Sequence, residues 1–126
     1  MGRCRKDIME FNMVINPTIT FWPNGNKCLE DWFYNHNYHR EDGPALICYN
    51  TTGELEEEYW FNTGFSHRID GPAYTLYNES GEIQAEHWYL YGKKTNHKEW
   101  LIDNNLYKPY NTWTDEEKLI FVLRWL

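Results

Sequence analysis

The chain has 126 residues, which is the length of a single domain, and its 19 acidic and 12 basic residues give a formal net charge of −7. This charge argues against a protein that binds duplex DNA, because such a protein needs a basic surface to release counterions from phosphates. Aromatic side chains make up 18% of the residues, so a few large rings can supply much of the buried surface.

The first six residues superficially resemble the start of a doubly acylated protein. Gly2 could carry a myristoyl chain and Cys4 a palmitoyl chain, but Lys6 stands where the myristoylation motif has Ser or Thr. We therefore interpret this segment as a disordered basic start.

The three cysteines, Cys4, Cys28 and Cys48, show no C-x-x-C spacing. We expect them to be reduced, which favours a cytoplasmic protein. The longest uninterrupted apolar run, Leu119 to Leu123, is far too short to span a bilayer.

From Val14 onward the sequence repeats with a period of 28 residues, as the spacing of Trp32, Trp60 and Trp88 shows. A fixed period of this length indicates a repeat architecture. We predict one domain over residues 1–126, with repeats at about 14–38, 39–66 and 67–94 and a helical cap over 95–126. The first repeat is degenerate, because Asn16-Pro17 replaces the Gly-Pro of the later copies.

Each repeat contains two β-branched or aromatic runs separated by a polar loop that closes with glycine, which is typical of a β-hairpin. The expected strands cover residues 18–22, 27–34, 45–49, 54–61, 73–77 and 82–90, with short connecting strands at 38–40 and 65–68. One hairpin alone is marginally stable, whereas three stacked hairpins bury one another's equivalent side chains. The predicted fold is therefore mostly β, a single antiparallel meander of repeated hairpins capped by a C-terminal α-helix, with no helix before Gly92.

The stretch His39–Ala45, which reads H-R-E-D-G-P-A, returns as His67–Ala73, which reads H-R-I-D-G-P-A. The glycine is expected to take a positive φ, and the proline suits the first residue of a strand. In an extended chain the arginine and the aspartate two residues later share a side, so the two can clamp the turn by a charge-assisted hydrogen bond. Turn chemistry thus accounts for every residue of the motif. The functional alternative is a repeated ligand site that uses His39, Arg40, His67 and Arg68.

Alternation along the expected strands places Phe33, Phe61 and Tyr89 on one face with Leu55 and Ile83, and this face is predicted to be buried. Trp32, Trp60 and Trp88 then fall on the opposite face with acidic residues that include Glu56 and Glu58. A bulge near the strand ends would reverse the assignment. The tryptophan ladder is either covered by another element or serves as a binding platform.

The repeat pattern fails after Gly92, where Thr95-Asn96 replaces His-Arg, and helical spacing follows over Lys93 to Ile102. Thr114 to Glu117 forms a capping-box sequence that predicts a helix running to the C-terminus. We expect Leu119, Val122, Leu123 and Leu126 to pack on the last hairpin. Ile120, Phe121 and Trp125 then project elsewhere, which suggests a homodimer interface. The alternative is a monomer in which residues 104–111 fold back over those three side chains.

The pattern from Trp60 through Ala73 resembles the W-Y-x-x-G-x-x-H-R-x-D-G-P-A repeat of the MORN-variant family, which is common in bacteriophage and large-virus proteins. The resemblance covers about residues 18–94. It implies a meander of hairpins that acts as an interaction scaffold, and it carries no catalytic residues with it.

Two catalytic or metal readings are weak. His36, His39 and His67 could form a metal set, but Cys28 and Cys48 have no ligand spacing, and isolated histidine pairs are common by chance. Ser66, His67 and Asp70 are too close in sequence to converge as a nucleophile triad. We therefore expect no enzyme activity, no metal and no cofactor.

The favoured hypothesis is a scaffold that binds a protein partner, for example a viral or phage protein that acts on a host factor in the host cytoplasm. The alternative is a protein that binds or sequesters a small nucleotide. In that case the tryptophan rings would stack on bases, and Arg40 or Arg68 would hold phosphate.

Overall fold

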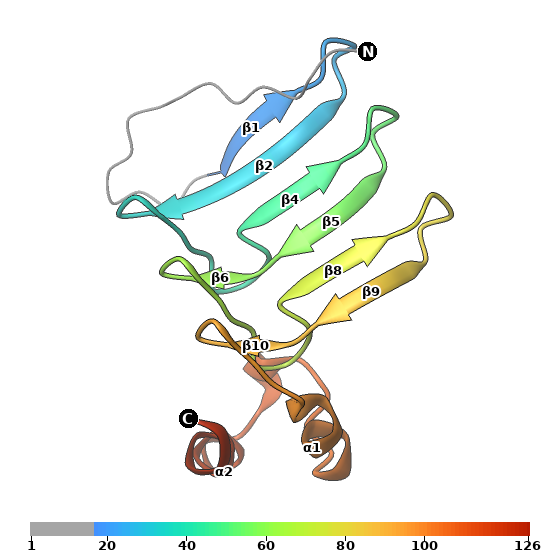
Figure 1. Cartoon of the computed structure of the whole chain (residues 1–126). Helices are drawn as coiled ribbons and strands as arrows, with labels where there is room; N and C mark the ends of the chain where they lie inside the picture. Colours follow the sequence, from blue (N-terminus) through green and yellow to red (C-terminus); the bar gives the residue numbers. More distant parts are fainter. Residues whose placement is uncertain (1–16) are drawn as a thin grey trace.

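The structure is a computed structural model that describes residues 17–126. The predictions made for Gly2, Cys4 and residues 14–16 therefore lie outside the described residues. From Pro17 onward the hairpins lie side by side in chain order, and two helices follow the last of them (Figure 1).

The main sheet is an antiparallel meander, and its strand order β1-β2-β4-β5-β8-β9 follows the sequence, with β3 pairing on the end of β2. Two further two-stranded sheets form outside this path: β6-β7 follows β5, and β10-β11 follows β9. The strands are β1 (Pro17–Phe21), β2 (Lys27–Tyr34), β3 (Asn37–Tyr38), β4 (Leu46–Tyr49), β5 (Leu55–Tyr59), β6 (Phe61–Asn62), β7 (Phe65–Ser66), β8 (Tyr74–Tyr77), β9 (Ile83–His87), β10 (Tyr89–Leu90) and β11 (Lys93–Lys94). The helices are α1 (His97–Asp103) and α2 (Asp115–Trp125), with a 3-10 turn at Tyr110–Thr112 between them. The predicted fold class, a mostly β meander with a C-terminal helix, is confirmed.

The hairpin loops have the predicted chemistry. Asn50 Oδ1 accepts hydrogen bonds from the backbone N–H groups of Thr52 and Glu54, both at 3.0 Å, and the loop closes at Gly53 with φ of 88°. Asn78 and Gly81 repeat this arrangement one period later. Since only glycine adopts such a φ without strain, the spacing of these glycines sets where each hairpin turns.

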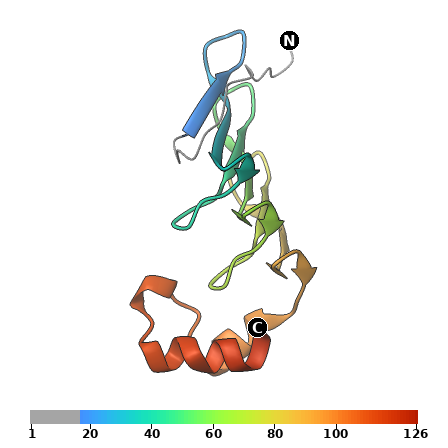
Figure 2. The ribbon, with the colours of Figure 1, turned by 90° about the vertical axis from the view of Figure 1, so that its left-hand side faces the viewer.

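The long second strands predicted for the last two repeats are broken at Trp60 and Trp88. Trp60 donates its backbone N–H to the carbonyl of Ala73 in the next repeat, at 2.7 Å, and its own carbonyl accepts from His67 at 3.1 Å. The chain then leaves the main sheet as a short connector hairpin, and Figure 2 shows such hairpins projecting to one side. The break changes which side chains share a face, so the prediction that Leu55 and Ile83 are buried with Phe33 is wrong for Ile83, which is 57% exposed.

A cluster of buried hydrophobic residues lies at the helical end, where the last hairpin meets the cap. It comprises Trp88, Leu90, Leu101, Leu106, Trp113 and Phe121. The capping box at the start of α2 is confirmed, because the Thr114 side chain accepts from the N–H of Glu117 and the Glu117 side chain accepts from the N–H of Thr114. Acidic residues in the first turn of α2 match its positive dipole end.

The predicted orientation of α2 is wrong. Phe121 is 1% exposed and meets the rings of His97, Trp100 and Trp113 at 5.7–5.8 Å, and Trp125 packs beside it. Neither ring is therefore available to a second copy. The residues expected to face inward, Leu119, Val122, Leu123 and Leu126, are exposed instead, as is Ile120. The preceding segment supplies the reason, because Leu106, Tyr110 and Trp113 form an apolar surface against which the two large rings pack.

The cysteine prediction is also corrected, because Cys28, which is 1% exposed, takes part in a disulfide, whereas Cys48 is free. Sequence spacing does not reveal such a bond, which depends on distance in the folded chain. Within residues 17–126, no helix is long and apolar enough to cross a membrane.

Candidate functional site

Each of the two histidines of the repeated motif holds the next connector turn along the chain. The backbone N–H of Thr63 donates to Nδ1 of His39 at 3.0 Å, and that of Tyr91 donates to Nδ1 of His67 at 2.9 Å. Thr63 and Tyr91 have φ of 45° and 46°, which is costly for residues other than glycine. Each histidine is buried and must be neutral at Nδ1 to accept, so both side chains have a structural use.

This arrangement predicts a loss of stability in mild acid. Burial, together with the nearby His97, lowers the pKa of His67 from its usual 6.5 to about 4. The unfolded chain therefore takes up a proton that the folded chain does not, and the free energy of unfolding falls as the pH drops from about 6.5 towards 4. Urea unfolding at several pH values should show this fall. The His67→Gln variant keeps an acceptor but does not titrate, and its pH dependence should be shallower. An equal pH dependence in both proteins would contradict the prediction.

The arginines of the motif cover the tryptophans. The guanidinium of Arg40 lies 4.0 Å from the Trp32 ring, and that of Arg68 lies 3.9 Å from the Trp60 ring. A cation over an indole ring contributes roughly 0.5–2 kcal/mol of stability, and the contribution is larger where water is excluded from the pair. Of the two alternatives for the tryptophan ladder, the structure supports the covered one at Trp32 and Trp60, because an arginine from the next turn lies over each of these two rings.

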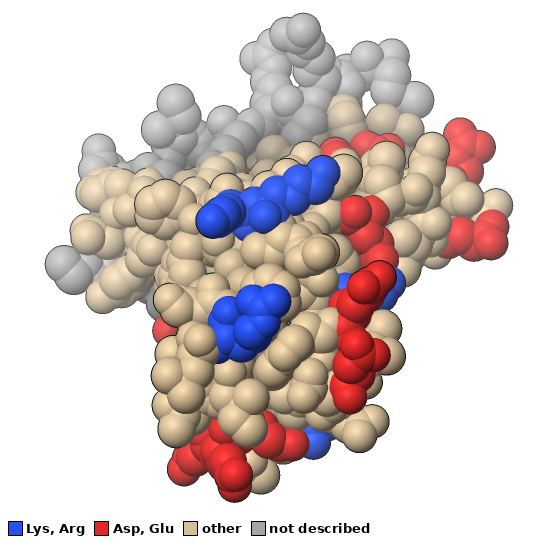
Figure 3. Space-filling view, turned by 60° about the horizontal axis from the view of Figure 1, so that its bottom comes forward, with Lys and Arg blue, Asp and Glu red and all other residues tan. Residues whose placement is uncertain are grey.

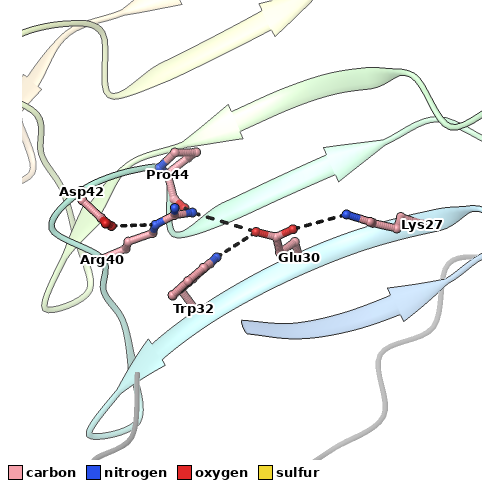
Figure 4. A network of polar contacts seen from close by, with 6 residues as sticks. All are labelled: Lys27, Glu30, Trp32, Arg40, Asp42 and Pro44. Atoms are coloured by element: carbon pink, nitrogen blue, oxygen red, sulfur yellow. Dashed lines mark hydrogen bonds and ion pairs between the residues drawn. The ribbon is translucent and has the colours of Figure 1, made fainter. Parts of the chain in front are cut away.

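Each guanidinium is fixed by its own turn. Arg40 Nε donates to Asp42 at 3.0 Å and its Nη1 donates to the carbonyl of Pro44 at 3.3 Å, as Figure 4 shows. Arg68 makes the same bonds to Asp70 and Pro72 at the same distances. The predicted arginine–aspartate clamps are thus present in both copies, and they hold the cations over the rings.

The glycine of the motif has a different role from the one expected. Gly43 and Gly71 are absent from the set of positive-φ residues. A Cβ at Gly43 would lie 2.6 Å from Arg40 Cζ, and a Cβ at Gly71 would lie 2.5 Å from Arg68 Cζ. Glycine is therefore needed here because the guanidinium passes directly over its Cα, not because of the backbone angle.

The third tryptophan is covered by the cap. Trp88 is 7% exposed and meets the His97 ring edge-on at 4.8 Å, with Tyr107 at 5.9 Å. The two acidic residues proposed for the binding face, Glu56 and Glu58 of β5, differ in their surroundings. Glu58 accepts a hydrogen bond from the Tyr77 hydroxyl at 2.6 Å, whereas Glu56 is exposed beside a hairpin loop.

An open cleft of about 770 Å³ lies between the motif turns and the segment that leads into α2. Asp70 fixes this segment, because its Oδ2 accepts from the backbone N–H of Tyr110 at 2.8 Å. The walls combine rings with charges of both signs. They include Trp60, Tyr91, Tyr107 and Tyr110, the cations Arg40, Arg68 and Lys108, and the acids Glu41, Asp42 and Asp70.

Four predicted site residues line this cleft, namely Arg40, Trp60, His67 and Arg68. Trp32, Trp88, His39, Glu56 and Glu58 are not among its lining residues. The tyrosines at 91, 107 and 110 were missed by sequence reasoning. The available signal was the density of aromatics between Tyr107 and Trp113, in a segment that shows no regular periodicity.

The metal cluster and the serine relay considered from the sequence can be checked in the described residues. Within residues 17–126, no three His, Cys, Asp or Glu side chains are grouped so that they could hold a metal ion. Nδ1 of His67 is occupied by the Tyr91 N–H, and Asp70 is engaged by Arg68 and Tyr110. Ser66, His67 and Asp70 therefore do not form the relay that a nucleophilic serine requires. No protein-family model, curated protein or solved structure matches the chain.

Proposed function

We propose that the chain is a non-enzymatic repeat scaffold that binds a protein partner, and that a segment of the partner lies in the cleft between the motif turns and residues 107–111. The observation that carries the proposal is the composition of this cleft. It is open, and Tyr91 and Tyr107 on its walls are 51% and 45% exposed. Exposed aromatic rings among arginine side chains are the residues that contribute most to protein–protein binding.

The cations of the cleft already have bonded partners within the chain, and this favours a polypeptide over a nucleotide as the ligand. The Nε and Nη1 groups of Arg40 and Arg68 already donate to Asp42, Asp70 and two carbonyls. Lys108 lies 3.8 Å from Glu117. A phosphate would have to compete with these bonded carboxylates, and a base that stacked on Trp60 would have to displace the Arg68 guanidinium from that ring. A polypeptide can instead pack on Tyr91 and Tyr107 and pair with charges of both signs at the rim.

Selection of peptides from a displayed random library against the immobilised chain tests the proposal. Peptides that use the cleft should bind the parent and lose at least tenfold in affinity on Asn111→Arg, which places a bulky charge in the cleft. Glu79→Arg, which adds the same side chain to an exposed hairpin loop, serves as the control and should bind like the parent. Failure to select any peptide, or peptides that bind both variants equally, would refute the cleft as the site.

A thermal-shift screen with ATP, GTP and cyclic nucleotides tests the alternative. A ligand present at a hundred times its dissociation constant adds about 2.7 kcal/mol of stability and raises the melting temperature by several degrees. We expect no shift with any of these nucleotides.

A further inference from the structure

The outer face of α2 is an apolar surface that nothing in the described chain covers. It consists of Leu119, Ile120, Val122, Leu123 and Leu126, and their exposed fractions run from 43% for Val122 to 78% for Leu123. These side chains project from the helix away from Phe121, the buried ring that holds α2 to the core. Figure 3 brings the helical end forward and shows mostly uncharged surface with separate basic and acidic groups. A contiguous apolar patch on a short helix is typical of an interface.

We infer that this face, which we call the outer α2 face, binds the same face of a second copy in an antiparallel, two-fold homodimer. Four of the five side chains, Leu119, Val122, Leu123 and Leu126, follow the i, i+3, i+4, i+7 spacing, which places them in one stripe. A stripe of this kind is complementary to itself. In an antiparallel pair the leucines of one helix can therefore fill the spaces between those of the other.

The charges along α2 select this partner and this direction. Acidic residues occupy the first turn, with Glu116 exposed, and Arg124 is the basic residue of the last turn. An antiparallel arrangement brings the acidic first turn of each helix beside the Arg124 end of the other. Both helix dipoles are then also aligned favourably. A parallel arrangement would instead place like charges together at both ends.

The contacts that α2 makes within its own chain leave Glu116 and Arg124 free to pair with a second copy. Within residues 17–126, the ion pair recorded for this helix joins Glu117 to Lys108, and Glu117 also closes the capping box. Glu116 has no ion pair of its own in this part of the chain, and Arg124 lies over its neighbour Trp125 at 4.2 Å. The cleft involves other surfaces, so the dimer does not depend on the proposed function.

Sedimentation velocity on the full chain, from about 1 µM to about 500 µM, tests the inference. The parent should pass from monomer to dimer over this range. Leu123→Glu should raise the dissociation constant at least a hundredfold, since it places a charge in the centre of the stripe. Ile83→Glu is the matched control, because Ile83 is also exposed, at 57%, but lies in β9, and its dissociation constant should stay unchanged. Circular dichroism checks that each variant is folded.

A charge exchange tests the direction. Glu116→Arg and Arg124→Glu should each weaken the dimer by about tenfold, because each creates two repulsive pairs in the two-fold assembly. The double variant should return to within about threefold of the parent, since the pairs are restored with reversed sign. A parent that stays monomeric throughout, a Leu123→Glu variant that dimerises like the parent, or a double variant weaker than both single ones would each overturn the inference.

Discussion

Replacing Phe121 with alanine should destabilise the chain by about 4 kcal/mol, the largest effect expected of any single substitution described. Phe121 is 1% exposed and touches aromatic rings from α1 and from the segment before α2. Its removal leaves a cavity lined by rigid rings that cannot easily collapse into it. Urea unfolding followed by tryptophan fluorescence measures the change.

The matched control is Leu123→Ala on the other side of the same helix. Leu123 is 78% exposed, so this substitution should change the free energy of unfolding by less than about 0.5 kcal/mol. Both unfolding measurements are made at a protein concentration low enough for the chain to be monomeric. If Leu123→Ala proved more costly than Phe121→Ala, α2 would pack through the face that sequence periodicity suggested.

The second large effect concerns the glycine of the repeated motif. Gly71→Ala should destabilise the chain by about 3 kcal/mol, because the new Cβ would lie 2.5 Å from Arg68 Cζ. The guanidinium would have to leave the Trp60 ring, and its bonds to Asp70 and Pro72 would be lost with it. Chemical denaturation of the single variant measures the cost.

A double-mutant cycle separates this contact from backbone strain. In an Arg68→Ala background the clash is absent, so Gly71→Ala should then cost less than about 1 kcal/mol. A backbone that required glycine would instead show the same cost in both backgrounds. The same cycle at Gly43 and Arg40 gives an independent repetition, since a Cβ there would lie 2.6 Å from Arg40 Cζ.

The sequence predicted what depends on local chemistry and on the period. Gly53 and Gly81 close the hairpin loops as expected, and Thr114 and Glu117 form the capping box. The arginine–aspartate clamps, two residues apart in both motif copies, are also in place. In each case the residues that interact lie within four positions of one another, so their types and spacing suffice.

Apart from the backbone angle expected at Gly43 and Gly71, the predictions that failed depend on contacts between residues further apart in the chain. The break at Trp60 exists because its N–H pairs with Ala73, and the arginine over its ring comes from the following turn. The periodicity along α2 identifies an apolar stripe of leucines. It does not show that the rings of the preceding segment pack against Phe121 and not against this stripe. The cleft was equally hidden, because Tyr91 and Tyr107 belong to segments that meet only after the cap has folded against the repeats.

The simple strand order of the main sheet has a mechanical consequence. Each strand of the path β1-β2-β4-β5-β8-β9 pairs with the next strand of this path along the chain, so a force pulling Pro17 away from α2 acts on one pair of strands at a time. The hydrogen bonds of such a meander are loaded in series and peel apart one after another, rather than shearing together. The chain should therefore yield under a small force in steps of roughly one repeat. A partner that bridges two repeats through the cleft would join neighbouring steps and stiffen the chain there.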